Sequence, residues 1–431
     1  MPLMKKVEKE ILKEKKWGEF LLPFYEKYCF SNITNVIKEF FKIRDNSSSA
    51  IIPKHLWKKE VQNSDKIIMF FIDGFGYYQW TKYYEKLNFF KNFTANGKII
   101  PLTTIFPSTT AATVTTINSG LTPNRHGLPE WTVYFKEIDM IINTLPFMPI
   151  LKTDRKSFAR KANPGILFKG KTIYQTLKEN RIKSFTFLSS AYAFSEYSNL
   201  IYRGSRRIPF DDLADLFSKL VKIVERTKGK AYFYVYIGNI DGVAHEFGPH
   251  TEEYRTELEI LNYLLQNAFV NQINKKVASK TTVMITADHG EINVSPEKTY
   301  YLNKFNALRK NFAKSKNGKT ILPTGSARDI FIHVKNGKID ETKKFLQNKL
   351  RKIAKVIAIK EAFKMNLFGI GEPTKQLKDR VGDLLVLPYK NHVIWYKHSK
   401  DEKFKLRGHH GGLSKDEMMT ELAIAKLDDL I

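Results

Sequence analysis

Three hydroxyl residues stand at the start of a segment whose composition fits a helix. Ser108, Thr109 and Thr110 follow Pro107, and small residues continue to Gly120. Ser and Thr are common helix N-caps, so a purely structural role is one reading. A hydroxyl at a helix start is also a good place for a nucleophile, because the free N–H groups and the helix dipole there favour an anion. The other chemistry-bearing segments of the chain decide between these roles.

Acidic and histidine side chains follow three apolar segments. Asp73 follows segment 66–72, Asp241 and His245 follow segment 231–237, and Asp288 and His289 follow segment 281–287. Carboxylate oxygens and imidazole nitrogens are ligands that suit divalent ions. An Asx-turn or a helix cap is the structural alternative at each place. The recurrence of an acid after all three segments favours a shared site.

A glycine-rich segment near the end of the chain carries two more histidines. His409 and His410 lie in the sequence Arg-Gly-His-His-Gly-Gly of residues 407–412. One of them joins the site if this segment returns to the ends of the apolar segments. The full set then has three carboxylates, three imidazoles and one hydroxyl.

The apolar segments predict the fold that positions these groups. Continuous apolar runs are typical of strands buried on both faces, as in a parallel sheet covered by helices. Helical patterns separate them at 172–180, 211–226 and 251–276. We therefore predict an α/β fold with a mostly parallel central sheet and helices on both faces. Ligands bind at the carboxyl ends of the strands in such sheets.

Four regions are expected along the chain. They are an N-terminal helical extension and linker (1–60), a catalytic core (61–327), a small α+β lid insertion (328–396) and a C-terminal return to the core (397–431). We expect residues 1–44 to be helical, with 45–49 as the linker. The insertion is read as strand, helix and strand, followed by a hairpin of 382–387 with 392–396. Residues 128–180 are an aromatic excursion that could wall a substrate pocket or be a loop pinned to the core.

The charge of the chain is strongly basic. Its 431 residues include 71 Lys and Arg against 44 Asp and Glu, a formal net charge of +27. Such a surface attracts nucleotides, nucleic acid or anionic lipid heads, although a Lys-rich proteome would give the same balance. Hydrophobic residues make up 42% of the chain, so a sizeable core is expected and wholesale disorder is not.

The cysteine count and the N-terminal sequence bear on the compartment. Cys29 is the single cysteine, which excludes a disulfide or a multi-cysteine metal site within the chain. The first 17 residues lack a signal-peptide core, and the most apolar run, 67–72, is too short to span a bilayer. We expect a soluble cytoplasmic protein without a membrane span, and the sequence leaves its oligomeric state open.

The combined groups suit two divalent ions about 4 Å apart. Such ions would activate a hydroxyl, clamp a phosphoryl oxygen and neutralise the developing charge. The hydroxyl would attack phosphorus in line, and water would later free the phospho-enzyme. The sequence alone thus points to phosphoryl transfer.

The chain resembles the alkaline phosphatase superfamily, and within it the type I phosphodiesterase/nucleotide pyrophosphatase family most closely. The resemblance lies in the ordered blocks IDGFG, FPSTT…SG…PNRHG, DGVAHEFGP, TADHG and GHHGG. In that family the nucleophilic Ser or Thr lies ten residues before the Gly of a T-G or S-G pair. Gly120 therefore implies that Thr110 is the nucleophile, in place of Ser108 or Thr109.

The resemblance also implies a division of the metal ligands. One ion would be held by Asp241, His245 and His410, since the last ligand of the family directly precedes a glycine. The other ion would be held by Asp73, Asp288 and His289, with Thr110 bridging or adjacent. Zinc fits His and Asp ligands best, and manganese or magnesium is open. The implied function is hydrolysis of a phosphodiester or nucleotide pyrophosphate through a phospho-threonine.

One departure from the family keeps the substrate open. Nucleotide-hydrolysing members carry an Asn shortly after the His-Gly pair, where it contacts the phosphate, and this chain has Leu-Pro-Glu-Trp at 128–131. Arg125 or the Lys-rich surface is a conceivable replacement. A phosphomonoesterase or phosphomutase of the same superfamily is an alternative. A basic nucleic-acid-binding protein with a vestigial site is a second alternative, which salt-dependent and metal-independent binding would identify.

Overall fold

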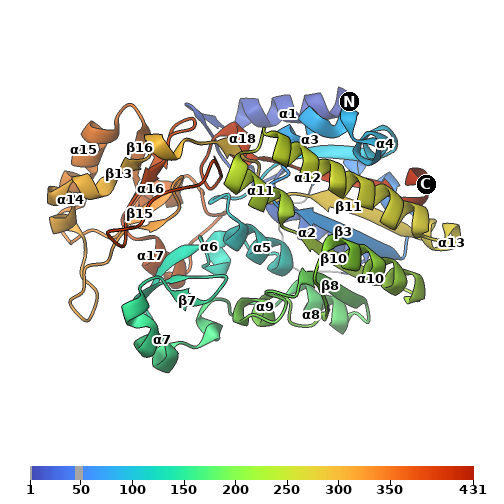
Figure 1. Ribbon diagram of the computed structural model, residues 1–431, viewed down its shortest axis with the longest axis horizontal. Coiled ribbons are helices and arrows are strands. Elements are labelled where there is room, and N and C mark those ends of the chain that lie inside the picture. The colour runs from blue at the N-terminus through green and yellow to red at the C-terminus, as the bar shows by residue number, and fades with distance from the viewer. Residues whose placement is uncertain (1, 44–51) are drawn as a thin grey trace.

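A seven-stranded sheet forms the centre of the protein (Figure 1). The computed structural model describes residues 2–43 and 52–431. The strand order is β4-β20-β11-β3-β10-β8-β9, in which β11, β3, β10, β8 and β9 are parallel and β20 is antiparallel to both of its neighbours. The bounds are β3 Lys66–Ile72, β4 Lys98–Thr103, β8 Lys183–Ser189, β9 Arg206–Phe210, β10 Ala231–Ile237, β11 Thr281–Thr286 and β20 Met419–Lys426. The predicted mostly parallel sheet is confirmed.

The three apolar segments lie side by side and end at the same level. Strand β3 is flanked by β10 and β11, with Ile72 opposite Ile237 and Phe71 opposite Thr286. All seven residues of β3 are buried, as the apolar run of residues 67–72 requires. Because the carboxyl ends of parallel strands meet at one edge of a sheet, the acidic residues that follow them meet there as well.

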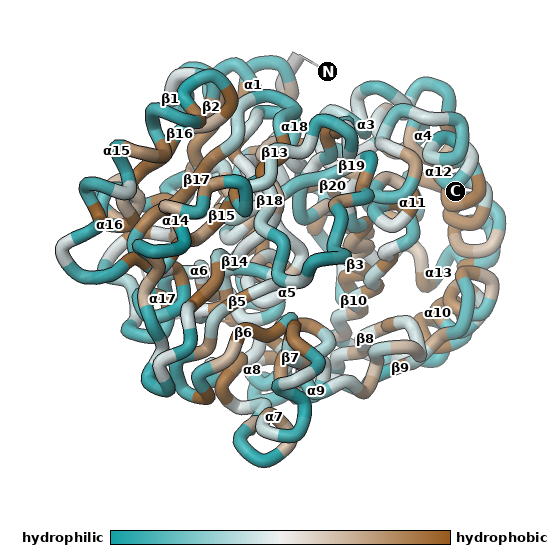
Figure 2. Tube along the Cα trace, turned by 60° about the vertical axis from the view of Figure 1, so that its left-hand side comes forward, coloured by the Kyte–Doolittle hydropathy of each residue, from teal (hydrophilic) through white to brown (hydrophobic). Residues whose placement is uncertain are grey.

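Helices cover both faces of this sheet, as alternate side chains of β3 show. Phe70 packs on Phe217 of α10 (Leu213–Arg226) and on Phe269 of the π-helical turn 264–269. Its neighbour Phe71 points to the opposite face and packs on Phe30. On that second face lie α2 (Ile33–Phe40), α5 (Thr110–Ser119), α8 (Ile173–Glu179) and α9 (Glu196–Ile201). Figure 2 shows the hydrophobic stretches gathered in the interior and hydrophilic ones in the peripheral loops.

Shorter helices complete the main layer around the sheet. Their bounds are α3 Tyr77–Tyr83, α4 Asn88–Asn96, α6 Pro123–His126, α11 Asn239–Phe247, α12 Glu252–Tyr263, α13 Lys275–Ala278 and α18 Lys415–Met418. The single helix expected over 251–276 is interrupted, because α12 passes into the π turn and a 3-10 turn that ends at Gln272. Asn274 then caps α13 by accepting a hydrogen bond from the Lys276 N–H.

The N-terminal extension packs on the main body but is only partly helical. Helix α1 (Pro2–Glu14) contacts β4, and α2 contacts α5. The expectation of helix between them is wrong, because β1 (Lys16–Trp17) and β2 (Phe20–Leu21) form a hairpin. Gly18 has a φ of +62° in its turn, a conformation that glycine adopts without steric cost. The expected linker at 45–49 lies outside the described residues.

A second hydrophobic core supports a smaller sheet at the left of Figure 1. Its strand order is β14-β15-β17-β16, and α14 (Asn306–Asn311), α15 (Ile339–Leu350) and α16 (Ile359–Lys364) lie beside it. The bounds are β14 Thr324–Gly325, β15 Ile330–Ile332, β16 Ala354–Ala358 and β17 Leu384–Pro388. The expected strand–helix–strand order over β15, α15 and β16 is confirmed. This second core also contains Leu302, Leu308 and Phe312, which precede the predicted start of the insertion at residue 328.

The expected hairpin of residues 382–387 with 392–396 is wrong. Strand β17 already has β15 on one edge and β16 on the other, so neither edge is open to a third strand. Strand β18 (Ile394–Trp395) pairs in parallel with β13 (Tyr300–Tyr301) instead. The exact limits of the four predicted regions stay a prediction.

The aromatic excursion folds into a small sheet of its own. Strands β5 (Thr132–Phe135), β6 (Met140–Asn143) and β7 (Met148–Pro149) pair antiparallel, and α7 (Arg155–Lys161) and α17 (Lys375–Val381) contact it. Within residues 2–43 and 52–431, every helix is too short or too polar to cross a bilayer.

Candidate active site

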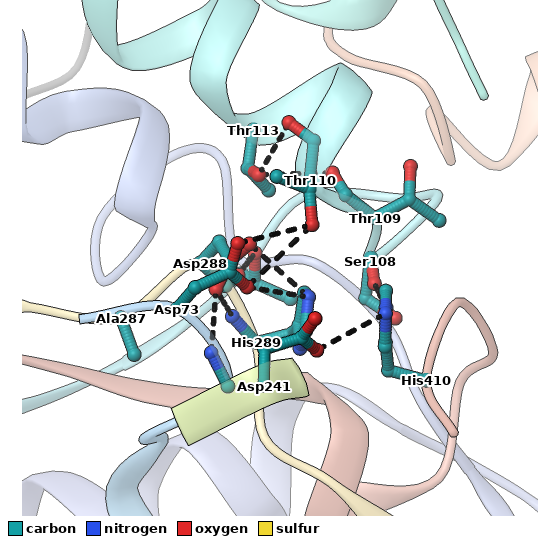
Figure 3. Close-up of polar contacts among 12 residues, drawn as sticks. Asp73, Ser108, Thr109, Thr110, Thr113, Asp241, Ala287, Asp288, His289 and His410 are labelled. Atoms are coloured by element: carbon teal, nitrogen blue, oxygen red, sulfur yellow. Dashed lines mark hydrogen bonds and ion pairs between the residues drawn. The ribbon is translucent and has the colours of Figure 1, made fainter. Parts of the chain in front are cut away.

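Asp73, Asp241 and Asp288 converge at the carboxyl edge of the central sheet (Figure 3). Asp73 directly follows β3, Asp288 comes two residues after β11, and Asp241 lies in the first turn of α11. Gly74 makes the approach possible, since a Cβ there would lie 3.1 Å from the Cα of Asp241. Its φ of +72° also favours glycine.

Asp73, Asp288 and His289 form one group of ligand atoms, all buried and within 4.8 Å of one another. The Nε2 atom of His289 lies 3.4 Å from Asp73 Oδ1 and 3.1 Å from Asp288 Oδ2. The other oxygen of Asp288 accepts hydrogen bonds of 3.1 Å from the N–H groups of Gly74 and His289, which fixes the carboxylate. Tyr236, the penultimate residue of β10, donates a hydrogen bond from its hydroxyl to Asp73 Oδ2.

A second group consists of Asp241, His245, His410 and Glu291, whose ligand atoms also lie within 4.8 Å of one another. The Oδ1 atom of Asp241 lies 3.4 Å from His245 Nε2 and 3.6 Å from His410 Nε2. Another combination brings His409 together with His245 and His410. The structure thus brings all six predicted ligands into the two groups that the resemblance implies, and metal binding by them stays a prediction.

The three histidines of these groups share one hydrogen-bond pattern. The Nδ1 atoms of His245, His289 and His410 donate to the carbonyl oxygens of Gly408, Gly290 and Ser108, at 2.9, 3.2 and 2.8 Å respectively. A neutral imidazole that donates from Nδ1 presents a lone pair at Nε2. Each Nε2 faces a carboxylate oxygen, an arrangement that is repulsive unless a cation lies between them. Backbone carbonyls orient metal-binding histidines in the same way.

Unsatisfied polar atoms support the same conclusion. Among the described residues, Asp241 Oδ1, Asp288 Oδ2 and His289 Nε2 are buried without a hydrogen-bond partner. Leaving such groups unpaired is costly, and carboxylate with imidazole is a donor set for Zn²⁺ or Mn²⁺. The residues present therefore fit divalent ions at both groups.

Electrostatics at the first group reflect its burial. Burial and the charges of Asp288 and Asp241 raise the pKa of Asp73 well above its usual range. Burial acts in the same direction on Asp288, but His289 outweighs it and holds the pKa of Asp288 below its usual range. Burial and the neighbouring imidazoles lower the pKa of His410, which keeps its ring neutral. Burial lowers the pKa of His289, but the charge of Asp288 outweighs it and raises that pKa above its usual range. The buried carboxylates thus concentrate negative charge that favours a cation.

Thr110 is the first residue of α5, and its hydroxyl points at the first group (Figure 3). The Oγ1 atom lies 3.4 Å from Asp73 Oδ2 and 3.5 Å from Asp73 Oδ1. Thr109 is the N-cap, yet its hydroxyl donates to the carbonyl of Pro129 at 3.4 Å and makes no cap hydrogen bond within the described residues. The Ser108 hydroxyl is buried and donates to Gly412 O at 2.9 Å. Of the three candidate hydroxyls, Thr110 alone is bonded to a ligand-group carboxylate in the described structure.

The segment carrying His409 and His410 is fixed from two sides. Strand β19 (Gly408–His409) pairs with β12 (Ile292–Asn293), just past β11. Glu417 accepts a 2.9 Å hydrogen bond from the N–H of Gly412 and a bidentate pair from buried Arg328, with distances of 2.9 and 2.8 Å. This clamp holds the segment at the strand ends, where the sequence analysis required it to return.

Some acidic residues near the site carry no motif that predicts them. Glu291 joins the second group, and its pKa is raised by burial and by the charge of Asp241. Glu130 and Asp329 are fully buried beside each other, and burial raises the pKa of Glu130 to about 7. The only available signal was the position of Glu291, three residues after Asp288.

Arg125 is exposed and lines a cavity of about 160 Å³ whose lining contains none of the ligand residues.

Curated relatives of the chain are snake-venom phosphodiesterases. Venom phosphodiesterase CdcPDE of Crotalus durissus collilineatus is 24% identical over 247 residues, which cover 56% of this chain and 28% of the relative. Venom phosphodiesterase of Macrovipera lebetinus is 22% identical over 247 residues, 56% of this chain and 27% of the relative. The matched region therefore spans less than a third of these relatives' own length.

Solved structures of similar fold come from mouse and human. Murine ectonucleotide pyrophosphatase/phosphodiesterase 5, an inactive Thr-to-Ala variant in complex with AMP, superposes with a TM-score of 0.63 at 16% identity, covering 84% of this chain and 88% of the murine chain. The human protein superposes with a TM-score of 0.61 at 15% identity, covering 84% of this chain and 87% of the human chain. The fold is therefore alkaline phosphatase-like, as the sequence predicts.

The model of one family matches most of the chain, from residue 67 to residue 413. This range includes Thr110 and both ligand groups. The chain thus belongs to the type I phosphodiesterase / nucleotide pyrophosphatase family.

Proposed function

We propose that the protein is a metal-dependent hydrolase that cleaves a phosphodiester or nucleotide pyrophosphate bond through a phospho-threonine at Thr110. The observation that carries this proposal is the 3.4 Å contact between the Thr110 hydroxyl and Asp73, at the first residue of α5. A nucleophile needs a group that accepts its proton or stabilises its anion, and it needs a binding place for the phosphoryl oxygens. Both requirements are served at this helix start.

The chain's own residues account for the steps around phosphorus. The Thr110 oxygen attacks phosphorus, the bond to the leaving alkoxide or phosphate breaks, and water later cleaves the phospho-threonine to regenerate the hydroxyl. The free N–H groups and dipole of α5 favour the negative charge that gathers on the phosphoryl oxygens. Divalent ions held by the two ligand groups would supply Lewis-acid stabilisation of that charge and activate the hydroxyl. We propose two ions, with zinc favoured over manganese or magnesium by the histidines.

Nucleotide-type substrates are the proposed class. Family membership supports this, as does the relative whose structure contains AMP. The net charge of +27 would draw anionic substrates towards the site.

Two chromogenic esters test the proposal. The wild-type protein and Asp288→Asn are treated with chelator, refilled with Zn²⁺ or Mn²⁺, and assayed on bis-p-nitrophenyl phosphate and p-nitrophenyl phosphate. We expect metal-dependent turnover that favours the diester and falls at least about 100-fold in Asp288→Asn, because the group that orients His289 and accepts two backbone hydrogen bonds is neutralised. A preference for the monoester would replace the proposal with a phosphatase or mutase, and turnover that survives chelation would overturn it.

A further inference from the structure

Glu291 is a buried carboxylate without a partner beside the second ligand group. Its side chain is 1% exposed, and neither carboxylate oxygen has a hydrogen-bond partner among the described residues. One of its oxygens lies within 4.8 Å of the ligand atoms of Asp241, His245 and His410. No Lys or Arg of the described chain forms an ion pair with it, and therefore its charge must be met by something else.

The main chain fixes the direction of this side chain. The carbonyl of Glu291 accepts a 3.0 Å hydrogen bond from Gln79, and the next residue begins β12, which pairs with β19 beside His410. The preceding Gly290 is so close to the neighbouring backbone that a Cβ there would lie 2.0 Å from the Asp416 carbonyl. The β12–β19 pairing that helps to position His410 thus also holds the backbone of Glu291 beside the second group.

Burial of an unpaired carboxylate is expensive, and two facing carboxylates add repulsion. Only a proton or a cation can relieve both costs at this place. A shared proton would satisfy one oxygen pair and leave the two imidazole lone pairs of His245 and His410 directed at carboxylate. A divalent ion satisfies both carboxylates and both imidazoles together.

We propose that Glu291 is a fourth protein ligand of the ion held by Asp241, His245 and His410; this inference rests on the metal dependence of the proposed function. Two carboxylates and two neutral imidazoles balance the charge of a divalent ion, whereas one carboxylate with two imidazoles leaves +1. The added oxygen ligand also moves the site's preference towards harder ions, Mn²⁺ relative to Zn²⁺. With Glu291 included, each group supplies two carboxylates, so the two sites carry the same ligand charge and differ in the number of imidazoles.

Metal content at controlled free ion concentration tests this inference. The metal-free protein, Glu291→Gln and Glu421→Gln are equilibrated with buffered Mn²⁺ or Zn²⁺, and bound ions per chain are counted by mass spectrometry. Glu421 is the matched control, because its carboxylate is equally buried and unpartnered yet belongs to neither ligand group among the described residues. We expect Glu291→Gln to lower the affinity for one of the two Mn²⁺ ions at least about tenfold, and the affinity for the corresponding Zn²⁺ ion by less. Glu421→Gln should bind both ions with wild-type affinity.

The outcomes separate this inference from the proposed function. If Glu291→Gln binds two Mn²⁺ ions with wild-type affinity, the fourth ligand is refuted even though the proposed hydrolysis stands. If the wild type binds two ions and Glu291→Gln one, the inference holds even where no diester is hydrolysed. A wild type that binds no ion refutes both. Glu291→Asp keeps the charge on a shorter side chain and provides the second variant, with Mn²⁺ affinity expected between those of Glu291→Gln and wild type.

Discussion

The imidazole rings of His289 and His410 lie stacked, with centroids 3.4 Å apart and planes inclined by 10°. The two rings belong to different ligand groups and to chain segments about 120 residues apart in sequence. A histidine of each ligand group thus packs directly against a histidine of the other group. A displacement of the segment that carries His410 is therefore expected to disturb both groups.

Gly408→Ala should cause such a displacement. A Cβ at Gly408 would lie 2.2 Å from the carbonyl oxygen of Ala244 in α11. The other nearest atoms are the carbonyl carbon of Ala244 and the ring Cδ of Pro249, so no flexible side chain can move aside. We expect kcat/KM on the diester to fall by about 100-fold, since a shift of about 1 Å has that effect on an aligned site. Steady-state kinetics measures the fall in kcat/KM, and counting of bound ions shows whether metal binding changes with it.

Gly242→Ala is the matched control for the same helix. Its Cβ would meet no atom of the described chain within 4 Å, and alanine is the better helix former. Its kcat/KM should remain within about twofold of wild type. Equal losses in the two variants would contradict the steric argument.

Thr110→Ala should abolish turnover while leaving metal content unchanged. The substitution removes the attacking oxygen and leaves Asp73, Asp288 and His289 in place, so we expect a loss of at least about 1,000-fold in kcat. Thr113→Ala is the control, because this hydroxyl, one turn along α5, donates to the carbonyl of Thr109 at 2.9 Å. Near-full hydrolysis by Thr110→Ala, or an equal loss in Thr113→Ala, would remove the nucleophile assignment.

The central sheet and the acidic residues at its edge were predictable because their signals are local. Strands β3, β10 and β11 consist mainly of apolar residues, and each is followed within four residues by an acid. Once the strands are parallel neighbours, their ends must meet. The positions of Asp73, Asp241 and Asp288 at one edge then follow from the pairing of β3 with β10 and β11.

Glu291 and the pairing of β17 could not be predicted in this way. A glutamate in a loop has no spacing that indicates burial, and its environment depends on the contact of Gly290 with Asp416, 126 residues away. The apolar pattern of 384–388 identifies a strand but not its partners. Both neighbours of β17 come from segments earlier in the chain, which places the strand in the interior of its sheet.

Arg328→Met should destabilise the protein and loosen the His410 segment. The guanidinium is fully buried, and its removal leaves the Glu417 carboxylate buried without a countercharge. Breaking one partner of a buried pair costs about 3–5 kcal/mol of unfolding free energy. Denaturant unfolding of the metal-free protein measures this loss.

The double variant Arg328→Met/Glu417→Met distinguishes a lost attraction from an isolated charge. Replacing both partners removes the uncompensated carboxylate, so we expect it to recover part of the free energy of unfolding. A double variant as unstable as the sum of the two single variants would show that the residues do not act as a pair.

His126 should make the protein sensitive to acid. Burial and the charge of Arg380 lower the pKa of His126 to about 3 from an ordinary 6.5, and its Nδ1 accepts a 3.0 Å hydrogen bond from the Leu128 N–H. Between pH 6.5 and pH 3 the unfolded chain binds a proton that the folded chain does not. The free energy of unfolding therefore falls as the pH falls through this window, by up to about 5 kcal/mol from this residue.

The pH dependence of unfolding in chelator checks the contribution of His126, because metal release then plays no part. His126→Gln should be less stable than wild type at pH 8 but should lose up to about 5 kcal/mol less on acidification to pH 3. His55→Gln is the control, since His55 is exposed, and it should follow the wild-type curve. Parallel curves for wild type and His126→Gln would mean that His126 is protonated in the folded protein at these pH values, and the neutral, hydrogen-bonded imidazole would be the wrong description.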